Sequence, residues 1–152
     1  MSKKDIECVY FCGLLHDIGK LKVEKEVLEK KEQLTDYEFQ IIKQHPIEGH
    51  ALIKPYTSEV IANAILLHHE RMDGSGYPFG LKAAEISIHA RIIMIADTYD
   101  AMTVRRIYRK PVSSVEALTE LASLRTQYDG ELLNSLKNTL HKNVNQRIIF
   151  SI

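Results

Sequence analysis

The sequence predicts an all-α fold, and three observations support this. Apolar residues recur at helical spacing, whereas the two-residue alternation typical of half-buried strands is scarce. Thr35, with Glu38 three residues later, forms the capping box that opens a helix. Only one loop is strongly marked, the segment Asp73–Pro78 with its two glycines and a proline. The remaining chain is therefore expected to fold as helices around that loop.

The first half of the chain contains two predicted helices. The first is apolar, runs from Asp5 to about Asp17 and ends near Gly19. The segment 22–33 that follows is charged and has few apolar anchors. The second helix begins at the Thr35 capping box, and Pro46 should end or kink it.

The second half is expected to hold four more helices. One opens at Ser58 with apolar residues on adjoining faces and closes just before the glycine-rich loop. A long helix follows from about Glu85 to Val104, and two more begin near Ser113 and Asp129. We find no linker or internal repeat, which predicts a single domain over residues 1–152.

Composition excludes several classes of function. The chain has 152 residues, of which 45% are hydrophobic and 26% charged, as in an ordinary globular domain. Lys+Arg and Asp+Glu are equal at 20 each, which argues against a surface for duplex nucleic acid or an anionic membrane. The two cysteines, Cys8 and Cys12, are spaced for one helical face rather than for a disulfide framework. No apolar run is long enough to span a bilayer and Met1–Asp5 does not open a signal peptide, so we expect a cytoplasmic protein.

Histidines and carboxylates occur in local groups that suit metal ions. His16 and Asp17 sit at the end of an apolar helix, with Lys20 about one turn beyond on the same side. His68 and His69 close a later helix immediately before the glycine-rich loop. The alternative for the first group is a helix-terminal histidine and a lysine favoured by the helix dipole.

Two further candidate ligands lie elsewhere. His45 precedes Pro46, and Asp97 lies in an apolar stretch where an unpaired carboxylate would be costly. His45 could instead be a solvated residue at a helix end, and Asp97 could instead form a salt bridge to Arg91 or Arg106. The joint occurrence of these residues with the His-Asp and His-His pairs is what favours a metal site.

Such a ligand set suits phosphodiester hydrolysis. Two divalent ions about 3.5–4 Å apart can activate a water molecule and neutralise the charge that develops on phosphorus. Mixed imidazole and carboxylate ligands favour transition metals such as iron or manganese over calcium.

Three motifs in order resemble the HD-GYP family, a branch of the HD phosphohydrolases. They are His16-Asp-Ile-Gly-Lys20, then His68-His-Glu-Arg-Met-Asp-Gly-Ser-Gly-Tyr-Pro-Phe-Gly-Leu81, and Ala90-Arg-Ile-Ile-Met-Ile-Ala-Asp97 with Asp100-Ala-Met-Thr103. The resemblance extends from about Leu14 to Leu133, and the loop motif is its most specific part. It implies an HD-domain helical bundle with two or three metals that hydrolyses cyclic di-GMP, or a related cyclic dinucleotide, to the linear dinucleotide or to GMP.

The resemblance also implies roles for individual residues. It gives Asp17 the place of the ligand that bridges two divalent transition metals, iron or manganese, and Lys20 that of a catalytic residue that contacts substrate phosphate or protonates the leaving oxygen. Tyr77, Arg91 and Arg106 correspond to substrate contacts, whereas Asp73 and Gly76 are expected to shape the loop. The implied metal ligands are His16, Asp17, His45, His68, His69 and Asp97.

The sequence departs from the family pattern in three places. The family has a further metal-binding histidine upstream, whereas the fifteen residues before His16 contain none. The segment Leu21-Lys-Val-Glu24 lacks the family's proline, and 103–109 keeps Arg106 but loses a serine and a proline. We therefore expect a bundle shortened at its N-terminus, with an apolar groove that a second copy could cover as a homodimer.

Two other functions remain open. One is an interaction module that has lost catalysis and docks through the loop onto diguanylate cyclase domains of the GGDEF type, as the resemblance implies. The other is a generic HD phosphohydrolase acting on mononucleotides, against which the specific loop argues.

Overall fold

The computed structural model describes residues 1–105 and 110–149, with side chains described as far as His141. Within this part of the chain it is helical throughout, and the only strand-like pairing is an isolated bridge between Asp73 and Lys82. The all-α prediction is therefore confirmed. The elements are α1 (Lys3–Leu15), the 3-10 helix η1 (Ile18–Lys22), α2 (Lys25–Leu28), α3 (Asp36–Ile42), α4 (His45–Ile53), α5 (Glu59–Leu67), the 3-10 helix η2 (Ala83–Glu85), α6 (Ile88–Thr103), α7 (Ser114–Ser123) and α8 (Gly130–Ile149).

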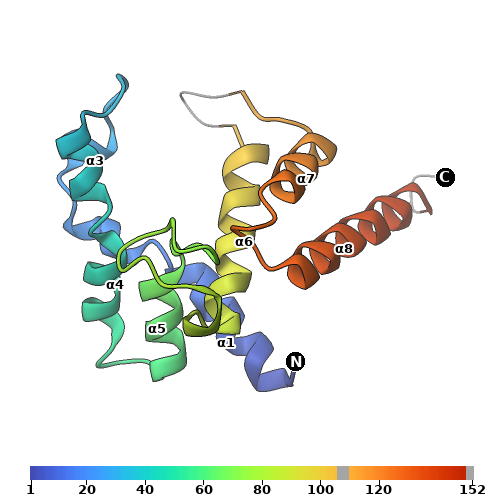
Figure 1. Cartoon of the computed structure of the whole chain (residues 1–152), viewed down its shortest axis with the longest axis horizontal. Coiled ribbons are helices and arrows are strands. Elements are labelled where there is room, and N and C mark those ends of the chain that lie inside the picture. The colour runs from blue at the N-terminus through green and yellow to red at the C-terminus, as the bar shows by residue number, and fades with distance from the viewer. Residues whose placement is uncertain (106–109, 150–152) are drawn as a thin grey trace.

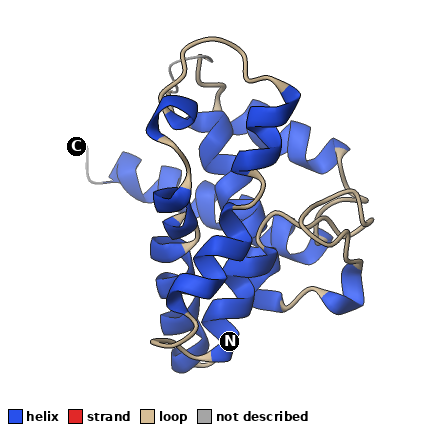
Figure 2. Ribbon diagram, turned by 90° about the vertical axis from the view of Figure 1, so that its left-hand side faces the viewer, coloured by secondary structure: helices blue, strands red, loops and turns tan. Residues whose placement is uncertain are grey.

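Helices α1, α5 and α6 pack against one another and form the centre of the molecule (Figure 1). Figure 2 shows that the described part of the chain consists of helices joined by loops. Cys12 of α1, Ala64 of α5, and Ile93 and Met94 of α6 all belong to the buried cluster between them. In Figure 1, α3 and α4 lie on one side of this centre and α8 extends away on the other. The candidate ligands lie on the α4 side, because α4 packs against both η1 and α5.

The contact between η1 and α4 depends on a glycine. A Cβ atom on Gly19 would lie 1.9 Å from the carbonyl oxygen of His45 and 2.5 Å from the amide nitrogen of Gly49. Since no side chain fits there, Gly19 lets the turn that follows Asp17 approach the beginning of α4. This approach brings the segment of Asp17 close to that of His45.

Local capping explains where most helices begin. Thr35 and Glu38 form the predicted capping box at α3, and Ser113 forms another with Glu116 at α7. Ser58 caps α5 through the amide nitrogen of Ile61. Pro46 lies in the first turn of α4, which begins just after α3 ends, so the predicted break at this proline is confirmed.

Two predicted boundaries were wrong. The first helix begins at Lys3 and ends at Leu15, because Ser2 and Asp5 form an unrecognised capping box and the chain leaves the helix before Asp17. The long helix begins at Ile88 rather than near Glu85, because Ser87 is its cap and η2 is a separate turn. The charged segment 22–33, for which no helix was predicted, contains the short helix α2.

The outer face of α1 is apolar and exposed. Ile6, Tyr10, Phe11 and Leu14 have exposed fractions of 60%, 63%, 49% and 61%, respectively. Cys12, one helical turn from Cys8, is fully buried on the opposite face. The apolar groove expected from the sequence and the homodimer both remain predictions. In the described part of the chain, no helix combines the length and the apolar character needed to cross a membrane.

Candidate metal centre

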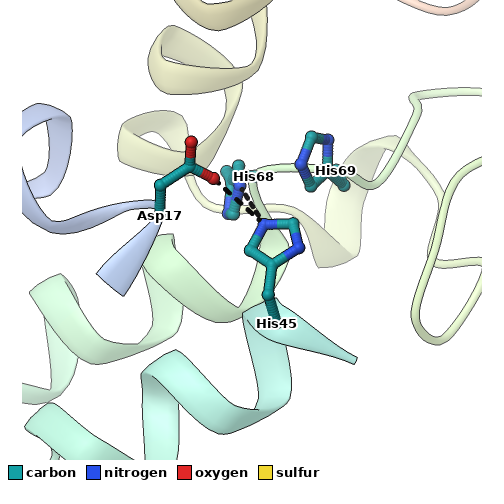
Figure 3. A group of neighbouring side chains, drawn as sticks. All are labelled: Asp17, His45, His68 and His69. Atoms are coloured by element: carbon teal, nitrogen blue, oxygen red, sulfur yellow. Dashed lines mark hydrogen bonds and ion pairs between the residues drawn. The ribbon is translucent and has the colours of Figure 1, made fainter. Parts of the chain in front are cut away.

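Four side chains from three separate segments meet at the junction of η1, α4 and α5. Asp17 follows α1, His45 is the first residue of α4, and His68 and His69 directly follow α5 (Figure 3). One ligand atom from each of these residues lies within 4.8 Å of the others. The structure therefore brings together four of the six predicted metal ligands.

Three imidazoles in this region are fixed in the same way. Nδ1 of His16, His45 and His68 lies 2.8, 2.8 and 2.6 Å from the carbonyl oxygens of Gly13, Ile42 and Ile65, respectively. Each carbonyl belongs to the residue three positions earlier, at a helix end where carbonyl groups lack partners. Because Nδ1–H donates to the carbonyl, the lone pair is left on Nε2, the atom available to a metal.

The resulting arrangement suits a cation. Nε2 of His45 lies 3.3 Å from Nε2 of His68, so two lone pairs face each other at short range. The Oδ1 atom of Asp17 lies 3.3 Å from Nε2 of His45, yet it is buried and accepts no hydrogen bond among the described residues. Facing acceptors with a buried orphan oxygen are unfavourable unless a cation lies between them. The residues present therefore fit a divalent metal ion.

The protonation states also favour metal binding. Burial lowers the pKa of His68 to about 3 and that of His69 to about 2, so both rings are neutral at pH 7. Burial alone would raise the pKa of Asp17, but the imidazoles of His16 and His45 and the ammonium of Lys20 around it outweigh burial and hold this pKa well below its usual range. The site therefore offers neutral imidazoles and an ionised carboxylate, the forms that bind metals.

His16 and Asp97 extend the cluster toward α6. Nε2 of His16 lies 3.4 Å from Oδ2 of Asp17 and 3.8 Å from Oδ1 of Asp97. The His16 and His68 rings also meet edge to face, with their centroids 5.3 Å apart. All six predicted ligands thus form one continuous group, in which Asp17 presents one oxygen to His45 and the other to His16.

The alternative for His45 was wrong, and so was one of the two salt bridges considered for Asp97. His45 is not a solvated helix-end residue, because only 1% of its side chain is exposed. Asp97 does not pair with Arg91, whose guanidinium donates to Asp129 and to the carbonyl oxygens of Ala83 and Ile86. Arg91 thereby holds the turn before α6, and its substrate contact remains a prediction. Arg106 lies outside the described residues.

Lys20 lies beside the predicted ligands, as expected from its spacing of about one turn beyond His16. Its Nζ atom lies 2.6 Å from Oδ2 of Asp17, beside the six-residue group. The lysine side chain is about one-third exposed, with 36% accessible, so its ammonium can reach a bound anion from the solvent side.

The glycine-rich loop folds back over the end of α5. The amide nitrogen of Tyr77 donates to the carbonyl oxygen of His69, and the two rings stack with their centroids 4.7 Å apart. Gly76 permits this fold, because a Cβ atom there would lie 2.4 Å from Cα of Glu70. Asp73 accepts hydrogen bonds from the amide and hydroxyl of Ser75, as expected for a residue that shapes the loop.

Glu70 anchors this loop, a role that the sequence interpretation missed. Its side chain is fully buried, and its two carboxylate oxygens accept hydrogen bonds from the amides of Phe79 and Leu81 at 2.7 and 3.0 Å. Among the described residues it has no cationic partner within ion-pair distance. A glutamate between two candidate ligands and a glycine-rich loop was a usable signal, because such a loop needs acceptors for its amides.

We expect Glu70→Gln to destabilise the protein by about 2 kcal/mol, since the new NH₂ group would face a buried backbone amide that needs an acceptor. Urea denaturation measures this free energy of unfolding. The matched control is Glu85→Gln, because exposed Glu85 also accepts a backbone amide, that of Lys82 at 2.9 Å. Equal stability of the two variants would contradict the anchoring role.

Comparison with known proteins agrees with this site. The HD domain family matches residues 1–132. The chain is 42% identical over 127 residues to a cyclic di-GMP phosphodiesterase of Thermotoga maritima, covering 82% of this chain and 34% of that protein. It is 39% identical over 125 residues to a cyclic di-GMP phosphodiesterase of Pseudomonas aeruginosa, covering 81% of this chain and 30% of that protein. A 3'3'-cGAMP-specific phosphodiesterase of Vibrio cholerae is 40% identical over 113 residues, which are 74% of this chain and 26% of that protein.

Solved structures share the fold. Bd1817, a HDG"Y"P protein from Bdellovibrio bacteriovorus, has a TM-score of 0.74 at 22% identity, covering 93% of this chain and 45% of that chain. The chain thus spans about a third of the length of the curated relatives named above and under half of this structure. The family match, the helical fold and the two motifs that meet at the candidate metal centre all agree. The chain therefore belongs to the HD domain family and is of the HD-GYP type.

Proposed function

We propose that this chain is a metal-dependent phosphodiesterase that hydrolyses cyclic di-GMP, or a related cyclic dinucleotide, to the linear dinucleotide or to GMP. The observation that carries the proposal is the group of buried, neutral imidazoles around the ionised carboxylate of Asp17, with Lys20 at its edge. The names of the relatives, which act on cyclic di-GMP or 3'3'-cGAMP, support the choice of substrate class.

The proposed cofactors are two divalent transition metals, iron or manganese. His45, His68, His69 and Asp17 would hold one, and His16, Asp97 and the same Asp17 would hold the other. Such ions supply Lewis acidity toward a phosphodiester and activation of the attacking water.

The other residues would bind and orient the substrate. The ammonium of Lys20 can donate to a phosphate oxygen or give a proton to the leaving oxygen, because it lies beside the carboxylate shared by both ligand sets. The ring of Tyr77 covers one face of His69, so it excludes water from that side of the centre, and its edge can contact the substrate.

Hydrolysis assays with manganese- or iron-loaded protein test this function. We expect turnover of a cyclic dinucleotide that EDTA abolishes, and little turnover of mononucleotides. Turnover of nucleoside monophosphates without turnover of any cyclic dinucleotide would favour the generic phosphohydrolase instead.

One observation favours a second role for the loop. Phe79 is 56% exposed although its amide is held firmly by Glu70, so a rigid turn presents an aromatic side chain to solvent. A diguanylate cyclase domain of the GGDEF type is the partner we propose for it. Partner binding that persists in Asp17→Ala and is lost in Phe79→Ala would separate this role from catalysis.

A further inference from the structure

The ammonium of Lys43, the C-cap residue of α3, lies over two aromatic rings. Its Nζ atom lies 4.8 Å from the ring centroid of Phe39 and 5.4 Å from that of Tyr77. Both distances are within the range in which an ammonium is attracted to an aromatic face. Since the Tyr77 ring stacks on His69, an unbroken series of contacts runs from Lys43 to the metal centre.

Lys43 also differs from the other half-buried lysines. Three described lysines are neither buried nor fully exposed, and two of them have carboxylate partners: Lys20 pairs with Asp17 and Lys30 with Glu38, both at 2.6 Å. Among the described residues, no carboxylate lies within ion-pair distance of Lys43. A cation that is partly desolvated and not neutralised beside a catalytic centre is available to an anionic ligand.

The proposed substrates contain one phosphodiester that the metal centre does not cleave. A cyclic dinucleotide carries two phosphodiesters in one ring, and only one of them is cleaved at a time. The metal ligands and Lys20 lie together on the Asp17 side and serve the cleaved phosphodiester. Lys43 contacts the Tyr77 ring, which stacks on His69, and so it lies at the Tyr77 edge of the site.

We infer that Lys43, supported by the rings of Phe39 and Tyr77, binds the second, uncleaved phosphodiester of the substrate. This inference rests on the proposed function and adds a distal subsite to it. The two rings hold the ammonium near one position, so little side-chain entropy remains to be lost when the phosphate binds. The subsite therefore selects substrates that carry two phosphodiesters over those that carry one.

The test compares cyclic di-GMP with bis(p-nitrophenyl) phosphate, which has a single phosphodiester. Lys43→Met keeps the aliphatic chain over the rings and removes the charge. We expect it to raise KM for cyclic di-GMP about tenfold, because one charge-assisted hydrogen bond is lost. The kcat for cyclic di-GMP and the kcat/KM for bis(p-nitrophenyl) phosphate should change less than about twofold. Lys43→Arg should restore most of the affinity, and exposed Lys54→Met is the matched control.

The possible results distinguish a failure of the proposed subsite from a failure of the proposed function. Equal losses on both substrates would mean that Lys43 only holds Tyr77 against His69, and this would overturn the inference. Turnover of cyclic di-GMP with unchanged KM in Lys43→Met would overturn it while leaving the function intact. A wild-type protein that hydrolyses bis(p-nitrophenyl) phosphate but neither binds nor hydrolyses cyclic di-GMP would contradict the proposed function itself.

Discussion

Asp17→Ala is expected to remove both metal ions, whereas His45→Ala removes only one. The two carboxylate oxygens of Asp17 face different partners, His45 at 3.3 Å and His16 at 3.4 Å, so one side chain serves both ligand groups. Its loss leaves two cations with no anion between them, and their mutual repulsion is strong at short range. We expect the loss of affinity to exceed the roughly 10–100-fold cost of removing a residue that only supports a ligand.

Elemental analysis of the purified variants measures this effect directly. Wild-type protein, Asp17→Ala and His45→Ala would be loaded with manganese in parallel and freed of excess metal. Circular dichroism checks that each variant keeps its helical content. Equal metal retention by Asp17→Ala and His45→Ala would contradict a bridging role for Asp17.

The second expectation is that the site of His45, His68 and His69 fills before the site of His16 and Asp97. Burial keeps His68 and His69 neutral at any pH well above 3, so a metal displaces no proton from them. A hydrogen bond with Asp17 raises the pKa of His16, so this ring holds a proton more readily than a free histidine does, and a metal must displace that proton. His16 and Asp97 are also about one-fifth exposed, with 23% and 21% accessible, whereas His45 is buried.

A manganese titration at two pH values measures this order. At pH 8 we expect two binding events that differ by about tenfold or more in affinity. At pH 6 the weaker event should weaken further as His16 becomes protonated, while His68 and His69 impose no such change. Two sites of equal affinity, or a pH dependence confined to the tighter site, would show that the ligands are assigned to the wrong groups.

Local sequence signals predicted much of this fold. The Thr35 box and the Ser58 and Ser113 caps involve contacts within three residues, so the pattern alone placed the starts of α3, α5 and α7. The Ser2 cap was missed although Asp5 supplies the same signal. The start of α6 was misplaced because the turn η2 at Ala83–Glu85 was read as part of the helix, whereas the cap is Ser87.

The sequence predicted which residues form the candidate site but not how they are arranged in space. His16, Asp17, His68 and His69 stand in recognisable pairs. The first pair meets His45 because η1 approaches α4 at Gly19, 26 residues before His45, and the second pair meets it because α4 packs against α5. The role of Glu70 depends on amides nine and eleven residues later, and that of Lys43 on a ring 34 residues away. The glycine-rich loop beside Glu70 signals that its amides need an acceptor, but no pattern of neighbouring residues predicts the contacts of Lys43.

Asp17, His45, His68 and His69 are expected to surround a divalent metal ion. Anomalous scattering from crystals of the manganese- or iron-loaded protein, recorded above and below the metal edge, tests this expectation most directly. We expect an anomalous peak among Nε2 of His45, Nε2 of His68, a ring nitrogen of His69 and a carboxylate oxygen of Asp17, with ligand distances of about 2.0–2.2 Å. Loaded crystals with no anomalous density among these four side chains would contradict it.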